Sequence, residues 1–508
     1  MSNAASYFVD RHVDEGRGQK VAFREVGTGR SLTYGALAEM SGIAAAAFAA
    51  HGVAREERVA MLVLDQIEFP ILFWGALKAG VIPVPLNTLL ATPVYDAILR
   101  DSRATTLIVS DALWEVVAPV IADNPYLKSV IVIGAAPWGT IGFDAFMALA
   151  DGPMPAFEAS DDETAFWLYS SGSTGQPKGV THVHSALRAT ADTYGAQVLG
   201  MREDDVVFSA AKFFFAYGLG NSMTFPMSVG ATVVIFGGRP TPDGIVDILR
   251  GERPSVFCGV PTLYAAMVAH MEAAGAPDVP LRICISAGEA LPEEVGARWH
   301  GLMGAHILDG VGSTEMLHIF LSNAPDNVVY GTSGVPVPGY DVRLVDEAGA
   351  EVGVDEVGEL LVNGASAAGG YWNKREKTRK TFEGVWTRTG DKYERRADGR
   401  YVYCGRTDDM FKVSGIWVSP FEVEQAISSH GAVLECAVVA KRDGDGLEKP
   451  KAFVVVNGTR PDTLEDALRD HVKDRIGKWK YPRWIECVES LPKTATGKIQ
   501  RFKLREDA

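Results

Sequence analysis

The most informative stretch of the sequence is Tyr169-Ser-Ser-Gly-Ser-Thr-Gly-Gln-Pro-Lys-Gly179, which follows the apolar run Ala165-Phe-Trp-Leu168. A loop of small and hydroxylated residues that leaves a strand exposes backbone N–H groups and hydroxyls, and Lys178 adds a cation. Such a loop can wrap phosphate groups. It is not a Walker A loop, which needs Lys directly after Gly and Ser or Thr directly after Lys. On composition alone, a flexible surface loop is the alternative interpretation.

Strand-like and helix-like patterns alternate on both sides of this loop. The helical pattern at 34–51 is one example of the stretches that separate the short β-type runs. This alternation indicates α/β layering with parallel strands, and we expect two related α/β layers packed together. The β-type runs lie at 58–64, 106–109 and 129–133 before the loop, and at 204–211, 231–236, 256–258 and 282–286 after it.

The pattern changes from about residue 330 to strands punctuated by glycine, such as 340–345 and 358–362. These strands predict antiparallel hairpins or a small barrel. A compact unit with a helix at 420–430 and strands at 437–440 and 451–456 follows. We therefore predict the α/β class, with a large N-terminal domain at 1–407 that includes a small β-barrel-like subdomain, and an α+β C-terminal domain at 408–508.

Composition and charge exclude several classes of protein. The 508 residues are 47% hydrophobic and 22% charged, which is typical of a globular chain with a large core. Lys and Arg total 49 against 64 Asp and Glu, a net charge of −15, so the surface disfavours nucleic acid.

Cysteine usage and hydropathy indicate the compartment. The five cysteines are far apart and never form a C-x-x-C pair, which fits a reducing cytoplasm. No apolar run approaches the roughly 18 residues of a membrane span, and the first residues lack the pattern of a secretion signal. We expect a cytoplasmic protein that is neither exported nor inserted in a membrane.

Further motifs follow the loop in a fixed order. They are Gly312-Ser-Thr-Glu315, Arg388-Thr-Gly-Asp391, Gly405-Arg-Thr-Asp408 and Pro492-Lys-Thr-Ala-Thr-Gly-Lys498. Alone, each Asp or Arg in them is more often a structural surface residue. In this order over nearly the whole chain, they resemble the adenylate-forming superfamily of acyl-CoA synthetases, firefly luciferase and peptide-synthetase adenylation domains.

The resemblance implies a site for ATP and Mg²⁺. Thr314 would meet the α-phosphate and Glu315 would bind Mg²⁺, which screens a carboxylate from the triphosphate. Asp391 would accept hydrogen bonds from the ribose hydroxyls, and Arg406 would add a guanidinium on the same nucleotide. Lys498 would bridge the carboxylate oxygen and the α-phosphate during attack. The implied catalytic residues are therefore Lys498, Thr314 and Glu315, with Glu315 as the metal ligand.

The resemblance also assigns the adenine contacts. Asp309 stands where the family places an Asp or Asn on the adenine amino group, and 287–289 resembles the backbone strip beside the adenine and the acyl group. The usual aromatic residue before the G-x-T-E motif is Val311 here, so stacking on adenine comes from elsewhere. The implied ATP- or AMP-binding residues are Ser170, Ser171, Gly172, Ser173, Thr174, Gly175, Lys178, Gly288, Glu289, Asp309, Gly310, Val311, Thr314, Asp391, Arg406 and Lys498.

Two segments resemble the benzoate–CoA ligase branch of the superfamily, at 212–221 and 313–320. An aromatic and glycine-rich pocket suits a flat ring. The alternative for the Phe213-Phe-Phe215 run is plain core, and His318 has the alternative of a satisfied core histidine. In the pocket, its imidazole would meet the carboxylate or a ring hydroxyl. The implied acid-binding residues are Phe215, Ala216, Tyr217, Gly218, Ala287, Gly312, His318 and Ile319.

The segment 411–420 resembles the same branch and implies contacts with coenzyme A. Gly415 would let the pantetheine pass close to the backbone, because glycine has no Cβ. Trp417 stands where many acetyl-type relatives carry Arg, so that arginine's role is not transferred, although Trp417 remains a candidate CoA contact. Asp408 occupies the hinge position about which the mobile C-terminal domain of relatives rotates between half-reactions.

The implied reaction has two steps, and several alternatives stay open. Carboxylate attacks the α-phosphate of Mg·ATP to give acyl-AMP and pyrophosphate, and the CoA thiol then attacks the acyl carbon. The resemblance implies an aryl-CoA ligase in the degradation of aromatic compounds, with benzoate and hydroxy-, amino- or halobenzoates as candidate acids. Alternatives are a cinnamate-like or medium-chain acid, a domain that loads a carrier protein, and a nucleotide-binding module without catalysis, which would require Lys498 or Glu315 to be missing.

Regulation and assembly are open at this stage. Acetylation of Lys498, a control used in some relatives, would remove its charge, and we hold it as a hypothesis. The sequence does not decide the oligomeric state, for which a homodimer is the commonest assembly. The expected partners are therefore an aromatic carboxylic acid, ATP and CoA, without nucleic acid or membrane.

Overall fold

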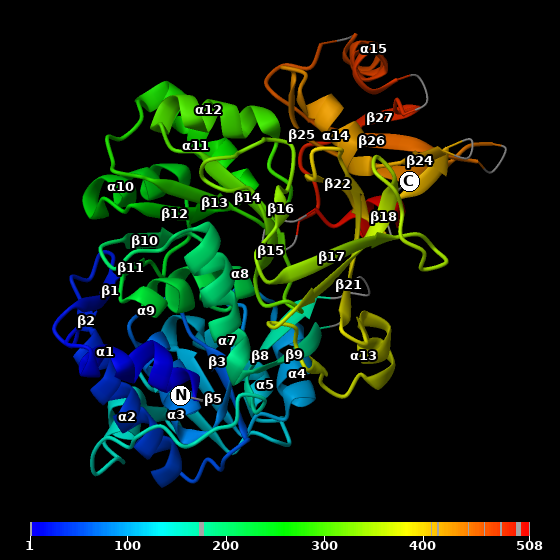
Figure 1. Ribbon diagram of the computed structural model, residues 1–508. Coiled ribbons are helices and arrows are strands. Elements are labelled where there is room, and N and C mark those ends of the chain that lie inside the picture. Colours follow the sequence, from blue (N-terminus) through cyan, green and yellow to red (C-terminus); the bar gives the residue numbers. More distant parts are fainter. Residues whose placement is uncertain are drawn as a thin grey trace.

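The computed structural model describes residues 3–171, 177–407, 409–413, 416–444, 447–461, 463–477, 480–493 and 499–506. Most of the chain forms two layers built on mainly parallel sheets (Figure 1). The nine-stranded sheet has the order β16 (Val335–Pro336), β15 (Ile319–Ser322), β14 (Ile307–Gly312), β13 (Ile283–Ser286), β12 (Val256–Gly259), β10 (Val206–Ser209), β11 (Thr232–Ile235), β1 (Val21–Glu25) and β2 (Ser31–Thr33). The five-stranded sheet has the order β4 (Ile82–Pro85), β3 (Arg58–Leu62), β5 (Thr106–Ser110), β6 (Ser129–Ile133) and β7 (Ile141–Gly142).

The central strands are apolar on both faces because helices cover both sides of each sheet. All residues of β5, β12 and β13 are buried. In Figure 1, α10, α11 and α12 cover one side of strands β10–β14. The predicted α/β layering with parallel strands is confirmed. The helices of these layers are η1 (Ser6–Asp10), α1 (Arg11–Asp14), α2 (Tyr34–Ala50), α3 (Glu68–Ala79), α4 (Thr92–Ser102), η2 (Asp111–Leu113), α5 (Trp114–Ile121), α6 (Phe143–Met147), α7 (His184–Thr190), η3 (Ala191–Val198), α8 (Ala216–Leu219), η4 (Gly220–Thr224), α9 (Phe225–Val229), α10 (Pro242–Glu252), α11 (Pro261–Ala274) and α12 (Glu293–Met303).

Local sequence explains where several helices begin. Thr33 caps α2, its side chain accepting from the Ala36 N–H at 3.2 Å. Thr241 caps α10 in the same way, and Pro242 in the first turn has the φ angle that a helix needs. None of the helices that the structure describes is both long and apolar enough to cross a membrane.

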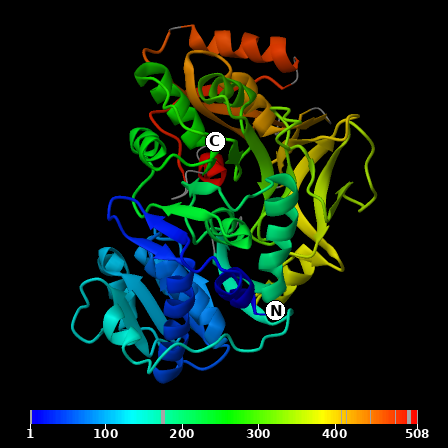
Figure 2. The same ribbon diagram turned by 60° about the vertical axis from the view of Figure 1, so that its left-hand side comes forward.

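Aromatic side chains join the two layers into one core. The backbones of these layers are the blue-cyan and green parts of Figure 2. Phe213 is fully buried in this core, stacked on Phe69 with ring centroids 4.6 Å apart and 6.4 Å from Phe23. The plain-core interpretation of the Phe213–Phe215 run therefore holds for Phe213.

A three-stranded antiparallel sheet carries the flanks of the glycine-rich loop. It consists of β19 (Gly370–Tyr371), β9 (Pro177–Val183) and β8 (Thr164–Ser171). The loop therefore joins two antiparallel strands, β8 and β9, which pair from Thr164 with Val183 to Ser171 with Pro177.

The third subdomain is an antiparallel sheet, as the glycine-punctuated strands predict. Strand β21 (Trp386–Arg395) lies at its centre and pairs with three others. The remaining members are β17 (Tyr340–Val345), β18 (Val357–Gly364), β20 (Phe382–Glu383) and β22 (Tyr401–Arg406), with α13 (Arg375–Thr381) preceding β20.

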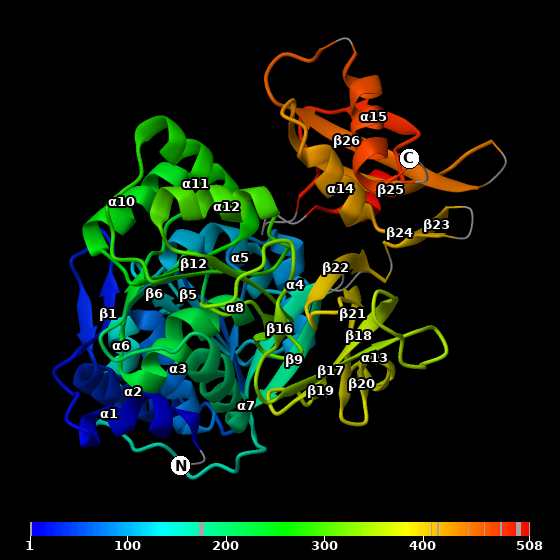
Figure 3. The ribbon, with the colours of Figure 1, turned by 45° about the horizontal axis from the view of Figure 1, so that its top comes forward.

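The C-terminal unit has a core of its own and stands at one end of the molecule (Figure 3). Phe411, Val423, Val438 and Leu468 are buried in that core. The boundary at residue 408 stays a prediction. The unit consists of β23 (Phe411–Val413), β24 (Ile416–Val418), α14 (Pro420–Ser428), β25 (Val433–Arg442), β26 (Glu448–Val456), α15 (Leu464–Ile476), β27 (Trp484–Cys487) and α16 (Arg501–Glu506).

Candidate active site

A tight turn between β14 and β15 carries the G-S-T-E motif. The Met316 N–H donates to the Ser313 hydroxyl at 3.2 Å, and the Leu317 N–H donates to the Thr314 carbonyl at 3.2 Å. Leu317 has a φ of 65°, a left-handed conformation that is strained for a branched side chain and is often found at functional sites. The turn places Glu315 and His318 on either side of this strained residue.

Glu315 forms a polar cluster with residues from β9 and β19. Its Oε1 atom lies 2.7 Å from the Lys178 ammonium and accepts a hydrogen bond from the Tyr371 hydroxyl at 2.7 Å. Lys178 also donates to the Tyr371 hydroxyl at 2.9 Å. Burial alone would raise the pKa of Glu315, but the Lys178 cation and the hydrogen bonds outweigh it and hold the pKa below its usual value. The cluster therefore keeps an ionised carboxylate inside the protein.

His182 lies behind this cluster on β9. It is fully buried and stacks on Phe166 with ring centroids 5.1 Å apart. Burial lowers its pKa to about 4, although the Glu315 carboxylate and the Thr314 backbone act in the opposite direction. At neutral pH the ring is therefore uncharged.

Asp391 and Arg406 face each other across the β21–β22 pair. Their Cα atoms are in register, and Arg406 Nη1 lies 2.8 Å from the Asp391 carboxylate. Arg406 also donates to the Thr389 carbonyl at 3.0 Å. Gly390, which precedes Asp391, has a φ of 73°, and a Cβ at this position would lie 2.7 Å from the Arg406 guanidinium. Glycine therefore permits both the turn and the close approach of Arg406.

Asp309 is buried on β14 beside a narrow cavity. Burial raises its pKa well above the ordinary value. Its Oδ2 accepts from the Leu291 N–H at 3.3 Å, whereas Oδ1 has no partner within hydrogen-bond geometry among the described residues. The cavity is lined by Ala290, Leu291, Asp309, Gly331, Thr332, Ser333, Tyr403, Phe421 and Gln425, so that α14 of the C-terminal unit supplies part of its wall.

An aromatic cage surrounds His318 next to this turn. The ring centroid of His318 lies 4.5 Å from Phe225, 5.5 Å from Tyr194 and 5.6 Å from Tyr217. Its Nε2 lies 3.2 Å from the Tyr217 carbonyl oxygen, which can only accept, so Nε2 donates and Nδ1 carries a lone pair. Nδ1 is buried without a partner among the described residues. Burial lowers the pKa of His318 to about 3, so the ring stays neutral.

Small residues let the cage close around this imidazole. A Cβ on Gly312 would lie 2.5 Å from the His318 carbonyl oxygen, and a Cβ on Gly220 would lie 2.4 Å from its ring. The Tyr217 hydroxyl donates to the backbone carbonyls of Gly259 and Ile285, both at 3.0 Å. These contacts fix the tyrosine ring between α8 and the nine-stranded sheet.

The comparisons with known proteins agree with this geometry. The model of the AMP-binding enzyme family matches residues 9–372, and that of the AMP-binding enzyme C-terminal domain matches residues 422–498. The chain belongs to the AMP-binding enzyme family. The fold predicted from the motifs, that of an adenylate-forming enzyme with two domains, is thereby confirmed.

Some relatives match this chain over nearly its full length. The chain is 54% identical to the 4-hydroxybenzoate–CoA/benzoate–CoA ligase of Rhodopseudomonas palustris, over 99% of this chain and 94% of the relative. It is 51% identical to the benzoate–CoA ligase of Thauera aromatica, over 99% and 95%. The crystal structure of a benzoate CoA ligase from Burkholderia xenovorans superposes with a TM-score of 0.91 at 48% identity, covering 99% of this chain and 100% of that one.

The structure brings several predicted site residues into pairwise contact. Lys178 and Glu315 are in contact, Asp391 pairs with Arg406, and Tyr217 contacts His318. Ala287 and Ile319 are buried in the same core. Some predicted residues lie outside the described ones, namely Gly172, Ser173, Thr174, Gly175, Asp408, Gly415 and Lys498, as do the side chains of Ser171 and Trp417.

Two residues of this region, Tyr371 and His182, were not predicted from the sequence. Tyr371 is 193 positions from its partner Lys178, and no local pattern marks it. His182 offered a weaker but usable signal, because side chains of a strand alternate and position 182 therefore shares a face with Lys178.

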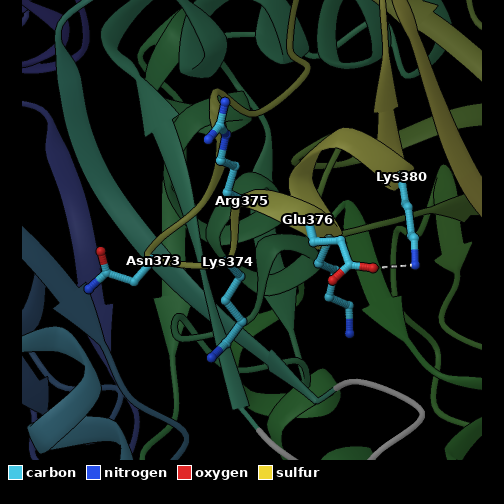
Figure 4. Close-up of a pocket in the computed structure, with 6 residues that line it drawn as sticks. Asn373, Lys374, Arg375, Glu376 and Lys380 are labelled. Atoms are coloured by element: carbon cyan, nitrogen blue, oxygen red, sulfur yellow. Dashed lines mark hydrogen bonds and ion pairs between the residues drawn. The ribbon is translucent and has the colours of Figure 1, made fainter.

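A separate surface cavity of about 540 Å³ lies beside α13 (Figure 4). Lys374, Arg375, Lys377 and Lys380 give it a basic lining, and Lys380 pairs with Glu376 at 2.6 Å. It contains none of the predicted site residues, and its charged lining does not suit an aromatic ring.

Proposed function

We propose that the protein is an AMP-forming aryl-CoA ligase, which joins benzoate or a ring-substituted benzoate to CoA through an acyl-adenylate. The observation that carries this proposal is the turn that sets Glu315 of the polar cluster three residues before the caged imidazole of His318. In this proposal, the nucleotide-phosphate site and the pocket for a flat ring adjoin at this turn. The identity to benzoate–CoA and hydroxybenzoate–CoA ligases over nearly the whole chain supports it.

Glu315 suits a Mg²⁺ site because it is an ionised carboxylate, the oxygen ligand that this cation prefers. Among the described residues, no group of three or more acidic, histidine or cysteine side chains gathers to hold a metal. Phosphate oxygens and water would therefore complete the shell. When bound, the ion would screen the phosphate charge as the carboxylate approaches.

The protein's own groups then divide the first half-reaction among them. Asp391 and Arg406 hold the ribose, and Asp309 accepts from the adenine amino group. Lys178 exchanges its contact with Glu315 for a phosphate oxygen, because an ammonium is a mobile point charge. Lys498 stabilises the charge that develops when the carboxylate attacks the α-phosphate and pyrophosphate leaves.

The second half-reaction requires the C-terminal domain to turn about Asp408. This rotation withdraws Lys498 and brings Gly415 and Trp417 toward the pantetheine. The thiol sulfur bonds to the acyl carbon, the bond from that carbon to AMP breaks, and the thioester forms.

AMP release tests the proposal. Mg·ATP with and without CoA is supplied with benzoate, hydroxy-, amino- and halobenzoates, cinnamate, hexanoate and acetate. CoA-dependent release that peaks on a benzoate is expected. Pyrophosphate formation at the same rate with and without CoA would indicate a carrier-protein acceptor instead. Activity that is highest with hexanoate or cinnamate would contradict the aromatic pocket.

The localisation, assembly and regulation of the enzyme belong to the same proposal. We infer a cytoplasmic enzyme that is controlled by acetylation of Lys498, and a homodimer is the commonest assembly for such a chain. The substitution Lys498→Gln mimics the loss of charge and should abolish adenylation. Wild-type activity in that variant would contradict both the catalytic role and the control.

A further inference from the structure

Two buried polar side chains on η4 lack hydrogen-bond partners. Asn221 and Thr224 are each 1% exposed. Neither amide atom of Asn221 nor the Thr224 hydroxyl has a partner within hydrogen-bond geometry among the described residues. Native interiors satisfy nearly all buried polar groups, and an unsatisfied one costs free energy. Two such side chains in one turn therefore indicate a place where a polar ligand atom completes the bonding.

Asn221 belongs to the cluster around the aromatic cage. It follows Tyr217 by four residues, so the two side chains project from the same side of the helical segment. Burial raises the pKa of the Tyr217 phenol, and the nearby Asn221 amide opposes that rise. The single hydrogen of the Tyr217 hydroxyl is shared between the Gly259 and Ile285 carbonyls. The Asn221 amide therefore lies beside Tyr217, and neither of its polar atoms meets hydrogen-bond geometry with a described residue.

A third side chain with an unsatisfied atom, His318, contacts Tyr217 and fixes the chemistry of the partner. His318 Nδ1 is a buried acceptor, because Nε2 donates to the Tyr217 carbonyl. A carboxylate has no hydrogen to offer such an atom, whereas a hydroxyl or an amino group does. Asn221 supplies a donor and an acceptor, and Thr224 supplies a hydroxyl. The cluster therefore matches a polar substituent with its own hydrogen, rather than the carboxylate of the acid.

We infer that Asn221 is a specificity-determining residue, which hydrogen-bonds a hydroxyl or amino substituent on the ring of the aromatic acid, with Thr224 contributing in the same turn. This inference rests on the proposed function and extends it from the aromatic ring to its substituent. A site built to bond such a group binds the unsubstituted ring less well, because its own polar atoms then stay unpaired.

The test compares substrates in variants of nearly equal shape. Asn221→Leu and Thr224→Val remove the polar atoms, and kcat/KM is measured for benzoate, 3- and 4-hydroxybenzoate, 4-aminobenzoate and 4-chlorobenzoate. In the wild type, a hydroxy- or aminobenzoate should exceed benzoate and 4-chlorobenzoate. Asn221→Leu should lower that ratio by about tenfold or more, and Thr224→Val should lower it less. A wild type without this preference, or a ratio that stays within about twofold in both variants, would overturn the inference.

A stability control separates recognition from a structural role. Asn323 is also 1% exposed, but its amide is fully used: it donates to the Asp309 and Thr332 carbonyls at 3.2 and 2.8 Å and accepts from the Val329 N–H at 2.9 Å. Asn323→Leu should therefore lower the midpoint of urea unfolding, whereas Asn221→Leu should leave it unchanged or raise it. An equal loss in both variants would make Asn221 a structural residue and overturn the inference.

Different results would contradict the proposed function and the inference about Asn221. If no aromatic acid supports AMP release by the wild type, the proposed function falls and the inference falls with it. If aromatic acids are used but the substituent ratio ignores Asn221, only the inference falls.

Discussion

At the level of single residues, Lys178 and Glu315 form a pair of opposite charges inside the protein. Lys178 and Glu315 are each largely covered and are held 2.7 Å apart, with Tyr371 bonded to both. Removing one partner of a buried pair leaves an uncompensated charge, which costs far more than the pair itself contributes. The cluster should therefore behave as a unit in mutational experiments.

We predict strong coupling between these two residues. Lys178→Met should lower the free energy of unfolding by about 3 to 5 kcal/mol, because Glu315 stays buried without its cation. The double variant Lys178→Met/Glu315→Gln should recover part of this loss, since no buried charge remains. Urea unfolding of the wild type, both single variants and the double variant measures the coupling. Strictly additive losses would contradict the buried pair.

His182 should make stability depend on pH in a defined window. Its folded-state pKa of about 4 lies below the ordinary value of 6.5, so between these values the unfolded chain binds a proton that the folded protein does not. Stability conferred by the neutral ring is complete above pH 6.5 and is lost as the pH falls. His182→Phe keeps a ring against Phe166 but removes this titration. Between pH 7 and pH 5, the variant should gain about 2 kcal/mol relative to the wild type. A constant difference measured by urea unfolding would exclude the assignment.

At the scale of elements, glycines position the site where backbones and side chains crowd together. Gly390 in β21 has positive φ and would clash with Arg406 if it carried a Cβ. Gly399, between β21 and β22, also has positive φ, but a Cβ there would meet nothing within 4 Å. The two positions therefore share a left-handed backbone conformation and differ in contact with the predicted ribose site.

Gly390→Ala should therefore impair nucleotide binding as well as stability. Positive φ costs an alanine about 1 to 2 kcal/mol at either position, but only the Cβ at position 390 displaces Arg406. We expect the KM for ATP to rise at least severalfold in Gly390→Ala and to stay unchanged in Gly399→Ala. Steady-state kinetics with ATP as the varied substrate measures both. Equal KM values in the two variants would remove Arg406 from the nucleotide site.

Elements and motifs were more predictable than contacts between them. The strand at 129–133 follows from a local apolar pattern and occurs where predicted. The G-S-T-E motif was recognised from residue type, but its turn between β14 and β15 was not predicted. The bond from Lys178 to Tyr371 depends on β19 pairing with β9, which no local pattern encodes. The orphaned amide of Asn221 was equally hidden, because sequence gives a residue's type but not whether its polar atoms are satisfied.

For the whole molecule, the two proposed half-reactions require two orientations of the C-terminal unit. The C-terminal unit has a separate core, and its α14 contributes Phe421 to the cavity beside Asp309. Rotation of this unit would therefore change the wall of that cavity as well as the position of Lys498. Asp408 is the predicted pivot.

Asp408→Pro should uncouple the two half-reactions. Proline fixes φ and removes a backbone donor, so the pivot could no longer adopt both conformations. Acyl-adenylate formation, measured by pyrophosphate release in single turnover, should be spared, while transfer of the acyl group to CoA should fall by at least about tenfold. Equal loss in both steps would argue against a hinge at this residue.

We propose that the carboxylate of an aromatic acid attacks the α-phosphate of ATP at this site. Turnover of benzoate or 4-hydroxybenzoate labelled with ¹⁸O in both carboxylate oxygens, followed by mass spectrometry of the products, tests it most directly. We expect one ¹⁸O in AMP and none in pyrophosphate, because the attacking oxygen stays on phosphorus when the thiol displaces AMP. AMP without label, or label in pyrophosphate or free phosphate, would contradict an acyl-adenylate.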